Sequence, residues 1–304
     1  MIDISGNTSL YGIIGDPVAH SLSPLFQNYF IHQAKKKSVY LPFHVASSNL
    51  SVALAGLHAS HIQGLNVTVP HKETILPMVN ADSDAQIIGA VNTLKRQPSG
   101  WEATNTDWQG FASVLQGLNV DVAHSSVLLF GAGGTSRAIC HALNHFGVQT
   151  LWICNRSGAR AENLAVDLRH SYPNIEVHVL PWEQAHVSEK SQQCDIMINS
   201  SSIGLNDNDI FPFTLQGDGV AIDVVYKKNG TTAFTNAAKQ VGFSTVDGLP
   251  MLIAQGIASF KFWHQSLTTN GSFHLPHLLT SLQWTEEQLG RQPADLPGWR
   301  TTSS

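Results

Sequence analysis

A glycine-rich turn, Gly131-Ala132-Gly133-Gly134-Thr135, directly follows the apolar run Val127 to Phe130 and precedes a helical pattern. Glycines between a buried strand and a helix let backbone N–H groups approach a pyrophosphate, and the helix N-terminus adds partial positive charge. The pattern therefore predicts a dinucleotide-binding loop. A serine, Ser136, stands where such loops usually have glycine or alanine, so a purely structural turn is the alternative.

The end of the next apolar run predicts which dinucleotide binds there. An NAD site would place an Asp or Glu about twenty residues after the loop, against the ribose 2′-hydroxyl. Here the sequence is Asn155-Arg156-Ser157, with Arg160 following. Arginines can pair with a 2′-phosphate through charge-assisted, multidentate hydrogen bonds, whereas a carboxylate would repel it. We therefore expect NADP rather than NAD; the alternative is two solvent-facing arginines at a helix start.

Four polar runs in the first third of the chain follow apolar runs, where their side chains can converge on a cleft. They are Ser21-Leu22-Ser23-Pro24, Asn66-Val67-Thr68-Val69-Pro70-His71-Lys72, Val91-Asn92-Thr93 and Asn105-Thr106-Asp107. Asn66 and Thr68 share one face of the predicted strand because side chains alternate. Lys72 stands at a helix start, where the helix dipole disfavours a cation, and this favours a functional role over a surface lysine. Asp107 has an alternative role as the N-cap of a helix from Trp108 to Leu118.

Short apolar runs and helical patterns alternate from Leu10 to Asp107 and predict an α/β layer to position these residues. The predicted strands are Tyr11–Ile14, Val39–Val45, Leu65–Val69 and a hairpin of Ile88–Leu94 with Trp101–Thr104. The predicted helices are Pro24–Ala34, Leu50–His58 and Glu73–Val79.

A second alternating unit begins at the glycine loop's own strand. Its predicted strands are Val127–Phe130, Thr150–Cys154, Ile175–Leu180, Ile196–Asn199 and Val220–Val225. Between the first strands lie a helix that Gly147 stops and one with Ala161, Leu164, Ala165 and Leu168 inward. Such βαβαβ alternation predicts a Rossmann-type, doubly wound parallel sheet. We expect domains at 1–107 and 108–247, with the helices of 248–304, including Met251–Trp263, packing back on the first domain.

Composition excludes several classes of protein. The chain has 304 residues, 42% of them hydrophobic, and a formal net charge of -5, which gives no field to attract nucleic acid or an anionic membrane. No uninterrupted apolar window approaches about 18 residues, and the N-terminus lacks a secretory pattern. Cys140, Cys154 and Cys194 lack C-x-x-C spacing and are expected to be buried thiols in a reducing compartment. These features predict a cytoplasmic protein.

Taken together, the motifs resemble the shikimate dehydrogenase family from Tyr11 to about His264. The family's order is kept in Ser-Leu-Ser-Pro, Asn-Val-Thr-Val-Pro-His-Lys, Gly-Ala-Val-Asn-Thr, Asn-Thr-Asp, Gly-Ala-Gly-Gly, Asn-Arg-Ser, and Asp247-Gly-Leu-Pro-Met-Leu with Gln255. The resemblance implies an NADP-dependent oxidoreductase that acts on a CH–OH group. Such an enzyme reversibly reduces 3-dehydroshikimate to shikimate with NADPH, a step towards chorismate and the aromatic amino acids.

The resemblance also implies roles for individual residues. Lys72 and Asp107 would be the catalytic pair, because a positioned ammonium can stabilise and protonate an oxygen that becomes negative when a ketone is reduced. The implied substrate-binding residues are Ser21 and Ser23 for the carboxylate, Asn66, Thr68, Asn92 and Gln255 for the hydroxyls, and Tyr226 near a cleft between the domains. The implied cofactor-binding residues are Gly131, Ala132, Gly133, Gly134, Thr135, Asn155, Arg156, Ser157, Arg160 and Gly248.

Three positions depart from the family pattern. Trp108 stands where glycine is usual, Ser200-Ser201-Ser202 stands where the family commonly has Ala-Thr, and His71 stands where phenylalanine is common. We expect His71 to be a bystander beside Lys72. Fifteen histidines raise the question of a metal, but the pairs His141 with His145 and His58 with His61 have no third ligand nearby, so we expect none.

Two other functions remain open. The substrate range could extend to quinate, although serines at both 21 and 23 favour shikimate, since loss of the second hydroxyl would make room for quinate's extra group. A regulator that senses metabolites without turnover is the second alternative, and the presence of both Lys72 and Asp107 argues against it. In either case the expected partner is a small molecule, and the expected state is a monomer or a homodimer.

Overall fold

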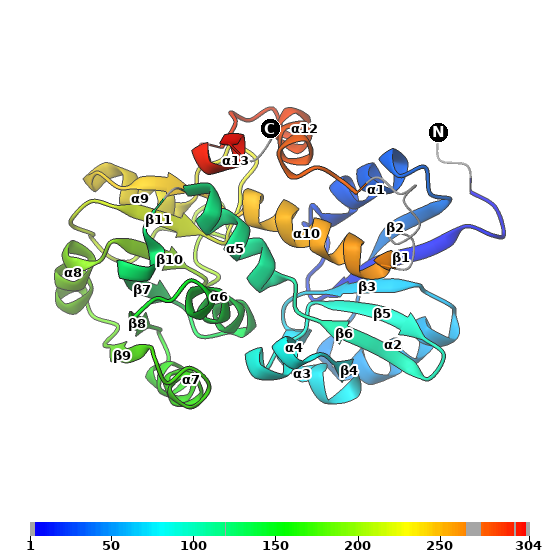
Figure 1. The fold of residues 1–304 in the computed structure, drawn as a ribbon, viewed down its shortest axis with the longest axis horizontal. Coiled ribbons are helices and arrows are strands. Elements are labelled where there is room, and N and C mark those ends of the chain that lie inside the picture. Colours follow the sequence, from blue (N-terminus) through cyan, green and yellow to red (C-terminus); the bar gives the residue numbers. More distant parts are fainter. Residues whose placement is uncertain (1–3, 119, 266–274, 295, 302–304) are drawn as a thin grey trace. The chain divides into compact units, whose positions relative to one another are not determined.

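A computed structural model describes residues 4–118, 120–265, 275–294 and 296–301 of the chain (Figure 1). The described residues fall into two compact units, those of Met1–Gly110 with Leu252–Ser281 and those of Phe111–Met251 with Leu282–Ser304. Each unit contains one six-stranded sheet. No helix in these four described ranges combines the length and the apolar character that crossing a bilayer requires.

The sheet of the first unit has the order β2-β1-β3-β5-β6-β4. Its strands are β1 (Ser9–Gly15), β2 (Ser38–His44), β3 (Gly64–Val67), β4 (Asn80–Ala81), β5 (Thr93–Gln97) and β6 (Gly100–Thr104). Strand β1 pairs in parallel with β2 and β3, while β5 pairs antiparallel with β3 and β6. The chain thus reverses direction at β5, which brings the end of β3, the start of β5 and the end of β6 to one edge of the sheet.

The helices of the first unit cover this mixed sheet. They are α1 (Ser23–Gln33), α2 (Leu50–Ala59), α3 (His71–Thr74), α4 (Ser83–Ile88) and, from Leu252 on, α10 (Leu249–Trp263). In Figure 1, α10 lies along the strands β1, β3 and β5. Trp263 fixes its end, since the indole N–H donates to the Leu94 carbonyl at 2.8 Å. A Cβ at Gly64 would lie 2.5 Å from the Trp263 ring, so the small residue in β3 admits the indole.

The sheet of the second unit is fully parallel, in the order β12-β11-β10-β7-β8-β9. Its strands are β7 (Ser126–Phe130), β8 (Thr150–Cys154), β9 (Glu176–Leu180), β10 (Ile196–Asn199), β11 (Val220–Asp223) and β12 (Ser244–Val246). The strand order reverses between β7 and β10. In such sheets ligands bind outside the carboxyl ends of the strands at this reversal. The predicted doubly wound sheet is therefore confirmed.

The helices of the second unit connect these strands, precede the first strand or follow the last. They are α5 (Asp107–Leu118), α6 (Gly134–His145), α7 (Gly158–Ser171), α8 (Gln184–Gln193), α9 (Ala233–Val241), α12 (Leu278–Leu289) and α13 (Pro297–Thr301), of which α5 and α12 begin in the first unit. Right-handed crossovers place α6 and α7 on one face and α8 and α9 on the other. The buried residues of α7 are the predicted Ala161, Leu164, Ala165 and Leu168.

Aromatic residues fill the core beneath α8 and α9. Phe130, at the end of β7, is fully buried and packs within 6.1 Å, between ring centroids, of Phe211, Phe213 and Phe234. Val187 of α8 belongs to the same cluster. Because Phe130 immediately precedes the glycine turn, this packing fixes the position of the first residue of the turn relative to the sheet.

Some sequence predictions were wrong in detail. Residues 83–88, the end of which was assigned to a hairpin strand, form α4, which ends at Gly89 with φ of 75°, and the strand begins only at Thr93. The strand predicted to reach Val69 ends at Val67, because the backbone turns there with the His71 N–H on the Thr68 carbonyl. The helices α8 and α9 and the strand β12 were not predicted.

The end of the chain also differs from the expectation that all of 248–304 packs on the first unit. Residues from Leu282 on belong to the second unit instead. Trp299 of α13 explains part of this, since its indole N–H donates to the Ser113 carbonyl of α5 at 2.7 Å. A Cβ at Gly117 would lie 2.6 Å from that indole nitrogen, so the glycine of α5 makes room for the ring.

We predict that Phe130→Ala lowers the free energy of unfolding by about 3–5 kcal/mol, because the substitution leaves a cavity among three aromatic rings. Chemical denaturation followed by circular dichroism measures this loss. Val166→Ala, at a position of α7 that is 59% exposed, is the control and should change the value by less than about 0.5 kcal/mol. Equal stabilities of the two variants would contradict the role of Phe130 in this core.

Candidate functional site

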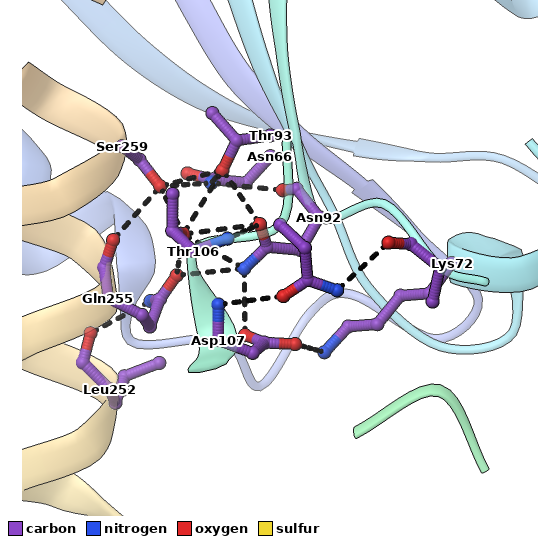
Figure 2. A network of polar contacts seen from close by, with 11 residues as sticks. Asn66, Lys72, Asn92, Thr93, Thr106, Asp107, Leu252, Gln255 and Ser259 are labelled. Carbon is purple, nitrogen blue, oxygen red and sulfur yellow. Dashed lines mark hydrogen bonds and ion pairs between the residues drawn. The ribbon is translucent and has the colours of Figure 1, made fainter. Parts of the chain in front are cut away.

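Lys72 and Asp107 form an ion pair in the first unit (Figure 2). The Lys72 Nζ lies 2.6 Å from Asp107 Oδ2, and the two side chains are 13% and 7% exposed. Lys72 comes from α3, directly after the turn that ends β3, and Asp107 is the first residue of α5, directly after β6. Two charges this far from water are stable only when further hydrogen bonds hold them. The pair predicted from the sequence is therefore brought together.

Asn92 supplies those further bonds. Its Nδ2 donates to Asp107 Oδ1 at 2.7 Å, on the carboxylate oxygen that Lys72 leaves open. Its Oδ1 accepts from the Thr106 backbone N–H at 2.7 Å and from the Thr93 hydroxyl at 2.9 Å. The Asn105 side chain in turn accepts from the Asp107 backbone N–H at 3.0 Å. The amide of Asn92 thus fixes the carboxylate, and the carboxylate fixes the ammonium.

Asn66 lies on the opposite side of this network, with its side chain in the interior (Figure 2). Its Nδ2 donates to Ser259 Oγ at 2.9 Å and to Thr93 Oγ1 at 3.1 Å, and its Oδ1 accepts from the Tyr40 hydroxyl at 2.8 Å. Because protein groups occupy both ends of the amide, Asn66 would contact a ligand only by exchanging one of these bonds. Thr68, predicted to share its face, lies past the end of β3.

Of the remaining predicted residues of the first unit, Gln255 contacts the network directly and Ser23 reaches it through Tyr40. The Gln255 Oε1 accepts from Asn92 Nδ2 at 3.4 Å, and its Nε2 donates to the Leu252 carbonyl at 2.8 Å. Ser23 is buried and shares a side-chain hydrogen bond with Tyr40. Burial raises the pKa of Tyr40 well above its ordinary value, and the bond with Ser23 lowers that pKa by a smaller amount. Ser21, half-buried, accepts from the Ser23 backbone N–H at 3.2 Å.

Sequence reasoning missed five members of the network. Thr93, Asn105 and Thr106 stand inside the polar motifs but received no role, and Tyr40 and Ser259 lie outside those motifs. Ser259 follows Gln255 by one helical turn on α10, and a search for polar residues at that spacing would have found it. His71 bonds to the Val45 carbonyl at 2.7 Å and is 1% exposed, which suits the bystander role expected of it.

The glycine turn of the second unit has the geometry of an anion-binding loop. Gly131 has φ of 116°, and a Cβ there would lie 2.7 Å from Ser200 Oγ, so this position requires glycine. A Cβ at Gly133 would meet only Arg160 Nη2, at 3.8 Å, so the backbone is open to a ligand from that side. Gly134 and Thr135 are the first residues of α6, whose N-terminal N–H groups follow the turn.

Two departures from the usual patterns meet at this turn. Ser136 and Ser200 lie with their hydroxyls 2.8 Å apart. Ser136 Oγ also accepts from the Gly133 backbone N–H at 3.0 Å, and Ser200 Oγ donates to the Phe130 carbonyl at 2.9 Å. The serines therefore tie the loop to the end of β10, at the point where the strand order reverses.

Both arginines of the predicted 2′-phosphate site are exposed, one just before α7 and one in its first turn. The Arg160 guanidinium reaches the surface of the glycine turn at Gly133. Asn155 Nδ2 donates to the Ser157 carbonyl at 2.8 Å and so shapes the turn between β8 and α7 that carries Arg156. The structure thus places the Arg160 guanidinium beside the open face of the loop.

The strand ends of β10 and β11 are joined by a buried carboxyl, Asp223. It accepts from Asn199 Nδ2 at 2.9 Å, from the Val225 backbone N–H at 2.9 Å and from the Thr232 hydroxyl at 2.5 Å. Burial nevertheless raises the pKa of Asp223 to about 7.

Tyr226 and Gly248 lie beyond the ends of β11 and β12. The half-buried Tyr226 follows Val225, and the Gly248 N–H donates to the Val225 carbonyl at 2.9 Å. A Cβ at Gly248 would overlap the Val224 carbonyl, so the backbone alone requires this glycine.

Within the described ranges, no group of three or more His, Cys, Asp or Glu side chains could hold a metal ion. The three cysteines are free and buried, and burial raises the pKa of Cys140 and Cys154 to about 12 and that of Cys194 to about 11. Thiols with such pKa values are poor nucleophiles.

Comparison with known proteins identifies relatives over most of the chain. Residues 13–94 match the family described as shikimate dehydrogenase substrate binding domain, and residues 114–204 match shikimate / quinate 5-dehydrogenase. The chain is 41% identical over 266 residues to the shikimate dehydrogenase (NADP(+)) of Aquifex aeolicus, which covers 86% of this chain and 93% of that protein.

Solved structures agree. The crystal structure of shikimate dehydrogenase from Aquifex aeolicus has a TM-score of 0.80 at 35% identity and covers 95% of this chain and 100% of that one. The shikimate 5-dehydrogenase of Thermus thermophilus, in complex with NADP(H) and shikimate, has a TM-score of 0.77 at 27% identity and covers 93% and 100%. The two-unit α/β fold predicted from the sequence is thereby confirmed.

We predict that Asp223 makes the free energy of unfolding fall as the pH rises from about 4 to about 7. In this window the unfolded carboxyl has lost its proton while the folded one keeps it, so the folded state binds more protons. Asp223→Asn cannot titrate, and its stability should rise relative to the unsubstituted protein as the pH increases. Denaturation at a series of pH values measures the difference, and parallel pH profiles would contradict the assignment.

Proposed function

Because this chain belongs to the shikimate dehydrogenase family, we propose that it catalyses the reversible reduction of 3-dehydroshikimate to shikimate with NADPH. The observation that supports this best is the buried Lys72–Asp107 pair, held by Asn92. A regulator without turnover would have no need of an ammonium held against a carboxylate beneath the surface, since such a pair contributes little net stability.

Lys72 carries the proton that the reaction requires. As the ketone is reduced, negative charge builds on its oxygen, and the Lys72 ammonium stabilises that oxygen and protonates it. In the oxidising direction the neutral lysine takes the hydroxyl proton. Asp107 and Asn92 hold the side chain at one place throughout, so that no reorganisation is needed when charge develops.

The substrate's polar groups are held by residues of the first unit. Ser21 and Ser23 bind the carboxylate, with Ser23 fixed by its place at the start of α1. Thr68, Asn92 and Gln255 bind the hydroxyls, and Asn66 supports them through Thr93 and Ser259. For Tyr226, a residue of the second unit, we keep the substrate-binding role that the family resemblance implies. Two serine hydroxyls for one carboxylate favour shikimate over quinate, whose additional group would need the same space.

The second unit holds NADP, which supplies or accepts a hydride when bound. Gly131, Ala132, Gly133, Gly134 and Thr135 offer backbone N–H groups and an open surface to its pyrophosphate. Arg156 and Arg160 pair with the 2′-phosphate, and Asn155 and Ser157 shape the turn that carries Arg156. Gly248 lies after β12, where the backbone alone requires glycine, and we expect it to contact the dinucleotide there. Free thiols at three buried positions suit a reducing compartment, so we place the protein in the cytoplasm.

Initial rates of NADP and NAD reduction, measured with shikimate and with quinate, test the proposal. We expect shikimate oxidation that depends on NADP, with slower or no oxidation of quinate. Comparable rates with both acids would make the protein a quinate/shikimate dehydrogenase. If neither acid is oxidised by the folded protein, the assignment as an enzyme fails and the sensing function takes its place.

We predict that Lys72→Met lowers kcat for shikimate oxidation by about 10² to 10⁴-fold, because the substitution removes the group that takes the proton. The side chain keeps its approximate length, so the fold should persist. Stopped-flow absorbance of NADPH gives kcat. Lys95→Met, which removes a lysine that lies over the Phe262 ring in the same unit, is the matched control and should keep the original rate. Equal rates for both variants would rule out the role of Lys72 in proton transfer.

The arginines determine the choice of dinucleotide. In the double variant Arg156→Gln, Arg160→Gln, we predict a KM for NADP that is roughly 10- to 100-fold higher, since two charge-assisted contacts to the 2′-phosphate are lost. The KM for NAD, which lacks that phosphate, serves as the internal control and should stay close to its original value. If both constants rise together, the arginines act on the fold of the turn and not on the phosphate.

A further inference from the structure

Arg291, which follows α12 near the end of the chain, makes a buried ion pair with Asp247. Its Nη1 donates to Asp247 Oδ2 and its Nη2 to Asp247 Oδ1, both at 2.9 Å, and the two side chains are 5% and 1% exposed. Both residues belong to the second unit. A two-point contact of this kind fixes orientation as well as distance. The guanidinium therefore holds the residue directly before Gly248.

The same guanidinium contacts a second loop. Arg291 Nη1 also lies 3.4 Å from the Lys227 carbonyl, in the segment between β11 and α9 that carries Tyr226. A Cβ at Gly230 would lie 3.1 Å from Arg291 Nη2, so this loop approaches the arginine closely. One side chain thus joins the loop after β11 to the loop after β12.

The chain around Arg291 is itself well fixed. Gly290 ends α12 with φ of 66°, and the Arg291 N–H donates to the Glu286 carbonyl at 3.0 Å. The Glu286 Oε1 accepts from the Ala294 N–H at 2.7 Å. Neither of the two family-model matches, residues 13–94 and 114–204, includes these contacts.

From these contacts we propose that Arg291 is a positioning residue that holds Tyr226 and Gly248 in place for substrate and dinucleotide. The inference rests on the proposed function for the roles of those two residues, but the contacts themselves do not depend on it. Without the arginine, Asp247 would be a buried carboxylate with no compensating cation among the described residues, which would leave it the bond from the Leu249 N–H at 3.3 Å. Such a carboxylate turns towards water, and the adjoining Gly248 moves with it.

Two variants of the full-length protein test this proposal, Arg291→Gln and the conservative Arg291→Lys. Arg169→Gln is the matched control, because Arg169 of α7 also bonds to a backbone carbonyl, that of Val177, at the opposite edge of the same sheet. The first measurement is amide hydrogen exchange without any ligand. We expect exchange in peptides covering 224–230 and 246–250 to become faster by an order of magnitude in Arg291→Gln, with exchange in β7 unchanged.

The second measurement compares kcat with the binding of NADPH. We expect Arg291→Gln to lower kcat for shikimate by about 10- to 100-fold, through misalignment, while the Kd of NADPH measured by fluorescence changes much less. The primary isotope effect with shikimate deuterated at the oxidised carbon should also increase, and a smaller folded fraction alone would not change it. Arg291→Lys should lie between the two proteins, because a lysine keeps the charge but cannot make both contacts.

The proposal is overturned if Arg291→Gln matches the unsubstituted protein in all three measurements. These are amide exchange in the two loops, kcat, and the isotope effect. If Arg291→Gln does not fold, Arg291→Lys carries the same comparison, and a loss of thermal stability without changes in exchange or isotope effect also overturns it. A failure of the proposed function looks different, because the unsubstituted protein would then not oxidise shikimate, while the exchange experiment would still report on the loops.

Discussion

A charged lysine stays beneath a protein surface only where a carboxylate compensates it, and Asp107 does this for Lys72. The requirement extends outward from the pair. Asp107 needs a second donor, which Asn92 supplies, and the other end of that amide needs donors, which Thr93 and Thr106 supply. Ser259 then connects these to α10 and Asn66 connects them to β3. The mixed sheet of the first unit is what brings these segments to one edge.

In the second unit, a few polar side chains join the ends of neighbouring strands. Its parallel strands end in backbone groups that must find partners, and polar side chains at those ends provide them. Ser136 and Ser200 connect the glycine turn to β10, Asp223 connects β10 to β11, and Arg291 connects the loops beyond β11 and β12. A rigid edge of this kind suits a site that has to hold a large, charged ligand in one orientation.

Local pattern predicted much of this fold, for physical reasons. The central strands β7, β10 and β11 of the second unit are buried on both faces, so they read as continuous apolar runs. The buried face of α7 followed from helical spacing alone. The polar α8 gave no such signal, and Gly89 turned part of a predicted strand into the end of a helix. Lys72, Asp107 and Asn92 stand in short contiguous motifs, and the order of those motifs along the chain carried the family resemblance that implied their roles. Ser259 follows Gln255 by one helical turn, a local spacing that could have found it, although its partner Asn66 lies 193 residues away. Arg291 acts through a contact across 44 residues, which no local pattern reveals.

The central claim is that Asn92 supports the reaction by holding the Asp107 carboxylate, which in turn holds Lys72. A double-mutant cycle on kcat tests this claim directly. The cycle compares Asn92→Ala, Asp107→Asn and the double variant with the unsubstituted protein at saturating shikimate and NADP. If Asn92 acts on the rate by holding Asp107, the double variant is no slower than Asp107→Asn alone. If the two losses multiply in the double variant, the residues act independently, and Asn92 does not act through the carboxylate.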